Sequence, residues 1–215
     1  MYSQFVQLAN GTDGIAERTV RIGEKRIPYL VGFDCTTRLA ERIAAEISDK
    51  SCAILLMDIA VLEHAAPVAE ALSERLRVIP SVVEVSEQNK TVASVERLIE
   101  HAIANGADRD SVVVGIGGGI LGNLAGMTAA LMYRGIPLVH LPTTPVAAFD
   151  SVLSAKQAVN MEAGKNLCGA FLTPRLIACD LAWLTTVPDR LLSTGIAEMA
   201  KNVAAVVPEQ HLQLT

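Results

Sequence analysis

Apolar and polar residues alternate with two different periods along the chain. Residues 19–32 (TVRIGEKRIPYLVG) alternate around Gly23, Glu24 and Lys25, which predicts two short strands joined by a tight turn. Residues 36–48 and 66–76 have apolar positions at helical spacing, and between them lies a compact apolar run, 52–58, ended by Asp58. The pattern continues with strands at 78–85, 111–117, 136–142 and 175–180 and helices at 91–106 and 123–135. Such alternation predicts a mostly parallel sheet with helices on its faces.

The pattern of residues along the chain changes after Pro142. Residues 142–171 are dense in small, polar and charged residues without a long periodic run, which is typical of segments that carry sites. Residues 181–207 begin helical structure around Pro188, and the last ten residues show no capping or closing pattern. We therefore expect an α/β domain over residues 1–180 and the beginning of a truncated C-terminal helical domain over residues 181–215.

Composition narrows the class of protein. The chain has 215 residues, of which 51% are hydrophobic and 19% charged, and this excludes disorder. The net charge of -5 comes without an acidic or basic block, so nothing favours nucleic acid or a membrane surface as partner, and a small molecule is expected. No apolar stretch is long enough to cross a bilayer and no leader pattern opens the chain, so we expect a cytoplasmic protein. The cysteines have no CxxC spacing, which predicts buried free thiols at Cys35, Cys52, Cys168 and Cys179.

A glycine-rich turn is the first candidate for chemistry. GIGGGILGNLAG (115–126) follows an apolar strand and opens a helix, where α/β sheets bind phosphates on backbone N–H groups. Alone it is a weak signal, because tight turns need glycine in proteins that bind nothing. Asp58, at the end of another strand, could accept hydrogen bonds from ribose hydroxyls. Glu87 and Lys90 could join the same site, although taken alone they favour a solvated helix start capped by Ser86 or Thr91.

Charged residues in otherwise small or apolar stretches form a second group of candidates. Lys156 and Lys165 lie nine residues apart and would suit two sides of a phosphate-bearing substrate. Each lysine taken singly is more often a surface residue. Glu198 and Lys201, spaced i, i+3, form either a surface ion pair or part of a metal site that needs further ligands. His140 lies in the middle of a predicted strand and is expected to be a satisfied core residue.

Together these pieces resemble one family. The stretches that carry the resemblance are GGGILGNLAG, YRGIPLVHLPTT, FDSVLSAKQAVN, GKNLCGAF and GIAEMAKN, in this order, within residues 58–202. They are similar to signature stretches of the dehydroquinate synthase superfamily of sugar-phosphate cyclases. Asn123 stands where dehydroquinate synthases usually have Asp, SAKQ replaces GGKT, and Met161 replaces a histidine. These departures resemble the 2-deoxy-scyllo-inosose synthases, which cyclise glucose 6-phosphate in aminocyclitol antibiotic biosynthesis.

The resemblance implies a Rossmann-like NAD-binding domain and a role for each matching residue. The residues implied to bind or flank NAD are Asp58, Glu87, Lys90, Gly118, Gly119, Gly122, Asn123, Thr143, Thr144, Ser154 and Asn166. Lys156 would be the catalytic lysine. The residues implied to orient the substrate or its phosphate are Arg134, Asp150, Lys165, Lys201 and Asn202. Glu198 would be the first of three ligands to zinc or cobalt, the other two being histidines of a C-terminal domain.

The implied activity is that of a carbon–oxygen lyase that uses NAD as a transient oxidant. Because half of the family's cleft lies in the C-terminal domain, we expect this chain alone to be inactive and to bind NAD weakly or not at all. The complete enzyme could form a homodimer. Three alternatives stay open: a 3-dehydroquinate synthase of the shikimate pathway, a metal-dependent polyol or alcohol dehydrogenase, and an inactive NAD-binding fragment.

Overall fold

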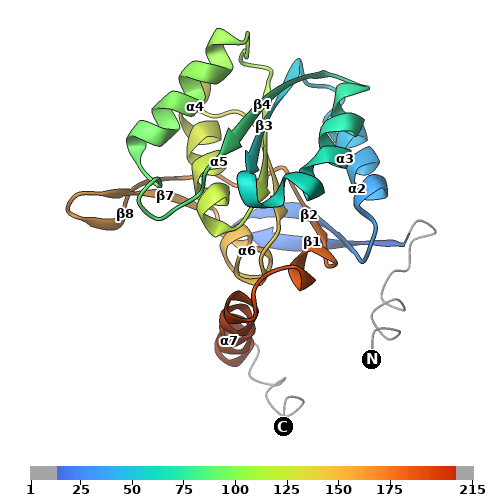
Figure 1. Cartoon of the computed structure of the whole chain (residues 1–215), viewed down its shortest axis with the longest axis vertical. Coiled ribbons are helices and arrows are strands. Elements are labelled where there is room, and N and C mark those ends of the chain that lie inside the picture. The colour runs from blue at the N-terminus through green and yellow to red at the C-terminus, as the bar shows by residue number, and fades with distance from the viewer. Residues whose placement is uncertain (1–13, 207–215) are drawn as a thin grey trace.

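The chain folds into three layers, with one sheet between two pairs of helices (Figure 1). The structure is a computed structural model that describes residues 14–206. The main sheet has seven strands in the order β1-β2-β9-β6-β5-β3-β4, and all neighbours run parallel except β1 and β2. The strands are β1 (Ile15–Ile22), β2 (Lys25–Gly32), β3 (Cys52–Asp58), β4 (Arg77–Val83), β5 (Val112–Gly117), β6 (Leu138–Pro142) and β9 (Leu176–Asp180). The predicted α/β class, with a mostly parallel sheet and an N-terminal hairpin, is confirmed.

Two helices cover each face of the sheet. Helices α2 (Thr36–Glu46) and α3 (Leu62–Ser73) pack on one face, and α4 (Val92–Ala104) and α5 (Gly119–Leu131) pack on the other (Figure 1). Strand β3 shows why its sequence is a continuous apolar run. Leu55 belongs to the core beneath α2 and α3, whereas Ile54 and Leu56 belong to the core beneath α4 and α5. A parallel strand buried on both faces needs apolar side chains at every position.

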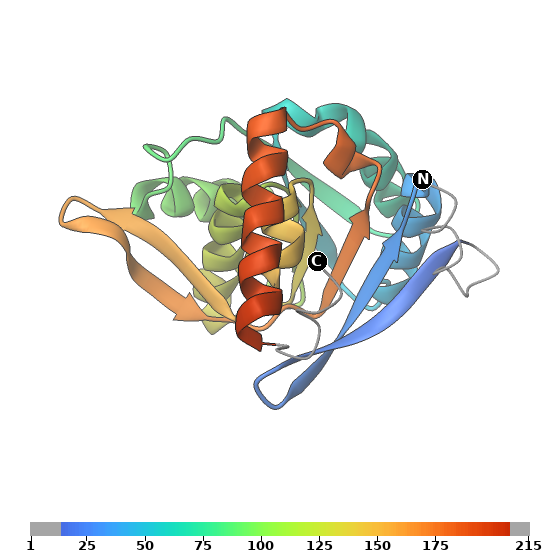
Figure 2. The ribbon, with the colours of Figure 1, turned by 90° about the horizontal axis from the view of Figure 1, so that it is seen from below.

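The segment after β6 builds the part of the molecule that extends from the sheet. Short helix α6 (Pro145–Phe149) leads to an antiparallel hairpin, β7 (Lys156–Met161) and β8 (Gly164–Phe171), and the last element of the described residues is α7 (Asp189–Val206). Figure 2 shows α7 crossing in front of the sheet, with the hairpin extending to one side. Two single turns of 3-10 helix lie in this segment, η3 (Ser151–Leu153) before β7 and η4 (Trp183–Thr185) before α7. Two others lie earlier in the chain, η1 (Ile59–Val61) after β3 and η2 (Met132–Arg134) after α5.

Helix α7 packs on α6 at Gly195, where a Cβ atom would overlap Pro145. The division of the chain into domains at residue 180 stays a prediction.

Two sequence expectations differ from the structure. Helix α5 begins at Gly119, four residues before the predicted start at Asn123, because Gly118 is its N-cap and the glycines adopt helical geometry. The site-rich segment 142–171 contains the β7–β8 hairpin, which was not expected. Strand β8 is largely exposed, so it lacks the apolar alternation by which a half-buried strand is recognised.

A close approach holds the hairpin against α5. A Cβ atom at Gly126 would overlap the side chain of Gln157, which is only 3% exposed, whereas a Cβ at Gly122 would meet His140 at an ordinary 3.7 Å. We expect Gly126→Ala to lower the free energy of unfolding by about 1–2 kcal/mol, since overpacking outweighs the gain in helix propensity. Gly122→Ala, the matched control on the same helix, should be neutral or raise it by up to ~1 kcal/mol. Urea unfolding of both variants tests this, and an equal response at the two glycines would contradict it.

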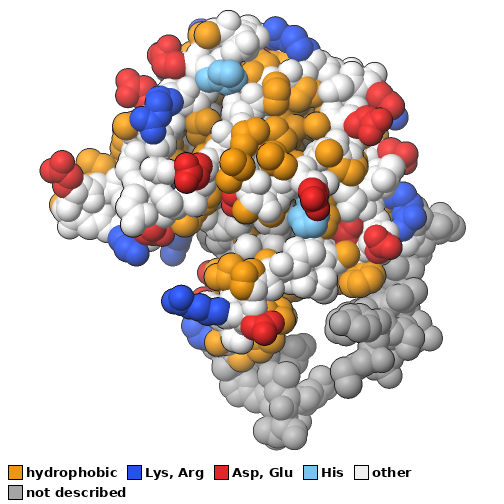
Figure 3. Space-filling view, in the orientation of Figure 1, with side chains coloured by type: hydrophobic (Ala, Val, Ile, Leu, Met, Phe, Trp, Pro, Cys, Tyr) orange, Lys and Arg blue, Asp and Glu red, His pale blue; other side chains and the backbone are white. Residues whose placement is uncertain are grey.

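The burial of the cysteines and the exposure of several apolar side chains can be compared with the sequence analysis. Cys35, Cys52 and Cys179 are buried free thiols as predicted, but Cys168 is half-buried because it lies on the hairpin. Ile196 on α7 is 57% exposed. Figure 3 shows further hydrophobic side chains gathered over the edge strand β4, where Val82 is 54% exposed. Within residues 14–206, no helix is both long enough and apolar enough to span a bilayer.

Candidate functional site

The glycine turn lies at the carboxyl edge of the sheet, beside the end of a neighbouring strand. Gly117 ends β5, Gly118 caps α5, and β3 pairs with β5 so that Asp58 ends one strand away. A Cβ atom at Gly117 would lie 3.2 Å from the Cβ of Asp58. The predicted placement of the turn and Asp58 at one edge is therefore confirmed. This edge is where open α/β sheets bind their ligands.

The turn has the geometry that a pyrophosphate requires. The first N–H groups of α5 have no acceptor within the helix, and its first turn carries no acidic side chain to compete with an anion. A Cβ at Gly118 would lie 3.3 Å from Cγ2 of Thr144, so any larger residue would crowd the approach to these N–H groups. The residues present thus fit a dinucleotide, and NAD is the one that the sequence predicts.

Other residues assigned to the cofactor have local structural contacts here. The Asp58 carboxylate accepts a hydrogen bond from Ala60 N at 3.0 Å, and Thr144 caps α6 by accepting one from Ala147 N at 3.3 Å. Thr143 is buried, and its N–H donates to the carbonyl of Gly117 at 3.0 Å. These contacts fix the backbone around the turn.

A cleft of about 410 Å³ gathers many of the predicted site residues on the hairpin side of this edge. Its lining includes Lys90, Asn123, Asp150, Ser154, Lys156 and Asn166. These residues come from the loop before α4, from α5, from the segment after α6 and from both hairpin strands. Sequence analysis assigned all of them to cofactor or substrate, and the fold brings them together.

Asn123 joins the hairpin to α5. Its Oδ1 accepts a hydrogen bond from Ala158 N at 2.8 Å, and its Nδ2 donates to the Gly119 carbonyl at 2.8 Å. The amide therefore holds strand β7 against the first turn of α5. This contact gives Asn123 a positioning role in addition to the predicted place beside the cofactor.

Lys90 and Glu87 are parts of one polar network, in which Lys90 is buried and the side chain of Glu87 is partly exposed. Lys90 is 6% exposed and donates from Nζ to Asn166 Oδ1 at 2.5 Å, while burial lowers the pKa of its ammonium group. The pKa of Glu87 is lowered chiefly by a hydrogen bond from Asn160, with help from the charges of Lys165 and Lys90. The solvated helix start considered from the sequence is wrong for Lys90. The capping role is confirmed at Thr91, whose Oγ1 accepts a hydrogen bond from Ser94 N at 3.2 Å.

The charged residues on the hairpin and α7 differ in their contacts, and of these lysines only Lys156 lines the cleft. Lys156 is exposed and lines the cleft, where its backbone N–H donates to Ser154 Oγ at 3.4 Å. Lys165 lies 3.6 Å from Oε1 of Glu87 and is otherwise open to solvent. Lys201 pairs with Glu198, which raises the pKa of the lysine, and the Asp150 carboxylate adds to that effect. Asp150 thus links α7 electrostatically to the cleft.

The described residues do not complete a metal site. No group of three histidine, cysteine or carboxylate side chains lies together within the described part of the chain, and Glu198 instead forms the i, i+3 ion pair with Lys201. A catalytic zinc or cobalt needs three protein ligands. Asn202 belongs to α7, but its side chain lies outside the described residues.

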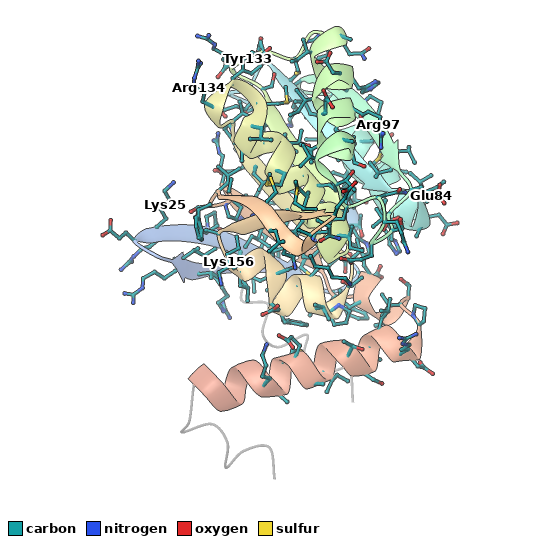
Figure 4. All side chains as sticks on the ribbon, turned by 90° about the vertical axis from the view of Figure 1, so that its left-hand side faces the viewer. Lys25, Glu84, Arg97, Tyr133, Arg134 and Lys156 are labelled. Atoms are coloured by element: carbon teal, nitrogen blue, oxygen red, sulfur yellow. The ribbon has the colours of Figure 1, made fainter. Side chains whose placement is uncertain are left out.

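Arg134 is the predicted site residue that the fold places elsewhere. It follows the C-terminal end of α5 and precedes β6, so it lies at the amino edge of the sheet. Figure 4 shows Arg134 and Tyr133 at the far end of α5 from Lys156. Arg134 therefore does not line the cleft that contains Lys156, and its role toward the substrate stays a prediction.

Two further residues change the sequence-based account. His140 is buried as expected, and burial lowers its pKa to about 4, so it is neutral. Asn160, which sequence reasoning missed, donates to the carbonyl and carboxylate of Glu87 at 3.1 and 2.9 Å. The only signal available was an asparagine two residues before the hairpin turn.

A mostly parallel sheet with a glycine turn at its carboxyl edge and a cleft beside it is the arrangement that α/β proteins use to bind dinucleotides. Residues 80–194 match the model of the family described as 3-dehydroquinate synthase N-terminal, and the chain belongs to this family.

Comparison with individual proteins gives the same relationship. The chain is 42% identical over 189 residues to a 2-deoxy-scyllo-inosose synthase of Streptomyces lividus, a match covering 88% of this chain and 49% of that protein. A crystal structure of 2-deoxy-scyllo-inosose synthase superimposes with a TM-score of 0.81 at 34% identity, over 87% of this chain and 53% of the other. Another, complexed with carbaglucose-6-phosphate, NAD+ and Co2+, gives 0.80 at 34% identity, over 87% and 52%. The chain spans about half the length of the curated relatives it matches.

Proposed function

We propose that this chain forms the NAD-binding half of a sugar-phosphate cyclase, a 2-deoxy-scyllo-inosose synthase acting on glucose 6-phosphate. The observation that carries the proposal is the gathering of Lys90, Asp150, Lys156 and Asn166 around one cleft, beside a glycine turn suited to a dinucleotide. The relatives at about 40% identity support the choice of substrate, and so does the 2-deoxy-scyllo-inosose synthase structure at 34% identity that is complexed with carbaglucose-6-phosphate.

The side chains of this chain would bind, orient and move protons. Lys156 is an exposed ammonium group in the cleft, suited to holding a phosphate and to sharing proton transfers with it. The Asp150 carboxylate would accept a hydrogen bond from a substrate hydroxyl. Lys165 and Lys201 would add positive charge at the two ends of the site. When bound, NAD supplies a hydride acceptor and returns the hydride later in the reaction. The net reaction therefore eliminates phosphate without net oxidation, as in a carbon–oxygen lyase.

Glu198 is proposed as one ligand of a divalent metal whose other ligands are not among the described residues. We assign no chemical step to that metal. The homodimer and the substrate role of Arg134 also stay predictions.

The second candidate substrate is that of 3-dehydroquinate synthase, which the matching family model names. Asn123 and the sequence SAKQ at 154–157 favour the first candidate, as the sequence comparison indicated. The two activities are distinguished by offering each sugar phosphate to the same preparation.

We expect the chain alone to bind NAD with a dissociation constant of about 1 mM or weaker, because only one wall of the cleft is present. Gly118→Val should remove this binding, since the added side chain would crowd Thr144 and the N–H groups of α5. Calorimetric titration of both proteins tests the proposal. Undiminished binding by Gly118→Val would contradict the assignment of the glycine turn to NAD. Micromolar binding by the wild type would contradict the expectation that this chain alone binds NAD weakly.

A further inference from the structure

The hairpin contains an irregularity where it reaches the loop before α4. Val159 pairs with Cys168 and Met161 pairs with Gly164, so Asn160 alone faces three residues of β8. The extra residues form a bulge, and Asn166 within it has a left-handed backbone with a φ of 57°. Bulges beside functional sites turn side chains in directions that a regular strand does not allow. Here the bulge presents Lys165 and Asn166 to the loop 87–90.

Asn160 makes the hydrogen bonds that fix this bulge. Its Oδ1 accepts from Asn166 N at 2.9 Å, which supports the left-handed residue. Its Nδ2 donates to both the carbonyl and the carboxylate of Glu87, and its backbone N–H donates to Lys90 O at 2.8 Å. One amide side chain thus joins two segments that are separated by 73 residues in sequence.

The groups held by Asn160 are those assigned to the cofactor. Lys90 donates to the side chain of Asn166, and Lys165 pairs with Glu87. Without the amide, Glu87 loses two hydrogen bonds, to its carbonyl and to its carboxylate, and Asn166 N–H loses its acceptor. The loop and the bulge would then be joined by fewer contacts, chiefly the hydrogen bond from Asn160 N–H to Lys90 O and the one from Lys90 Nζ to Asn166.

We propose that Asn160 is a positioning residue that couples the loop 87–90 to the bulge 165–166 and so sets the geometry of the cofactor end of the cleft. The effect on the cofactor rests on the proposed function, whereas the coupling itself does not. Asn160 acts through Glu87 and Asn166.

Two substitutions separate the parts of this role. Asn160→Ala removes every side-chain contact. Asn160→Asp keeps the acceptor for Asn166 N but places a second carboxylate where Nδ2 lies 2.9 Å from Oε1 of Glu87. The charged groups that face Glu87 are Lys165 and Lys90, and both remain in the two variants. Asn105→Ala is the matched control, because it removes an asparagine hydrogen bond to the His101 carbonyl at the end of α4, away from the cleft.

The first measurement is hydrogen exchange at the Asn166 amide in the chain itself. We expect protection to fall by ~10-fold or more in Asn160→Ala, to be largely retained in Asn160→Asp, and to be unchanged in Asn105→Ala. Unchanged protection in Asn160→Ala would overturn the coupling, whether or not the chain binds NAD.

The second measurement is NAD affinity as a function of pH. Both Asn160 variants should bind ~10-fold or more weakly than the wild type near neutral pH, and only Asn160→Asp should recover on acidification, when a proton shared by the two carboxyls restores a hydrogen bond. A purely structural role would give no such pH dependence. Wild-type affinity in both variants would overturn this inference and leave the proposed function intact. Absence of NAD binding both by this chain and by the chain joined to the C-terminal half of a 2-deoxy-scyllo-inosose synthase would overturn the proposed function and the cofactor role of Asn160, but not the coupling seen by exchange.

Discussion

Replacing Asp180 with alanine should lower the free energy of unfolding by about 3–5 kcal/mol, the largest effect on stability that we expect from one side chain. The carboxylate is fully buried at the end of β9. It accepts hydrogen bonds from Asp34 N and Cys35 N at 2.8 Å, Thr36 Oγ1 at 2.7 Å and Ala182 N at 3.0 Å. Two of these donors lie at the start of α2, where an anion is favoured by the helix dipole. Alanine would leave buried donors without an acceptor.

Asp180→Asn is the control for this prediction, since it keeps one acceptor oxygen and the shape of the side chain. The free energy of unfolding of Asp180→Asn should fall between that of the wild type and that of the alanine variant. Urea unfolding followed by circular dichroism gives the three values. A loss below about 1 kcal/mol in Asp180→Ala would show that the carboxylate does not connect β9 to α2 as described.

The second large effect concerns activity. In a protein made by joining this chain to the C-terminal half of a 2-deoxy-scyllo-inosose synthase, we expect Lys156→Ala to lower turnover by ~1,000-fold or more, as removal of a proton-transfer group at a phosphate does. NAD affinity should change by no more than ~2-fold, because Lys156 is not part of the network of Lys90 and Asn160. Lys25→Ala removes another exposed lysine, at the start of β2, which does not line the cleft, and serves as the control. A Lys156→Ala enzyme with more than about a tenth of wild-type turnover would exclude Lys156 as the catalytic lysine.

The sheet was predictable because burial leaves a periodic signal. Strand β3 matches its predicted bounds, 52–58, since every position of a central parallel strand is apolar. The exposed hairpin β7–β8 has no such signal, and its position is determined by contacts with α5 at Asn123 and Gly126 that chain order does not reveal. Start and end signals failed at α5 because a glycine run is normally read as a break in a helix.

The candidate site was predictable as a set of residues but not as a geometry. Family resemblance supplied Lys90 and Asn166, and only the fold shows that they share a hydrogen bond. Arg134 was assigned to the same group, yet its position between a helix and the following strand puts it at the opposite edge. Asn160 was missed because its role depends on a contact with a loop 73 residues earlier in the sequence.

The most direct test of the proposed cyclase follows phosphate release and NADH together. The joined protein is supplied with glucose 6-phosphate and NAD, with 3-dehydroquinate synthase substrate offered in a parallel reaction. The account predicts that phosphate is released catalytically from glucose 6-phosphate, with many turnovers for each NAD bound and no accumulation of NADH. Accumulation of NADH in step with substrate consumed, or release of phosphate only in the parallel reaction, would contradict it.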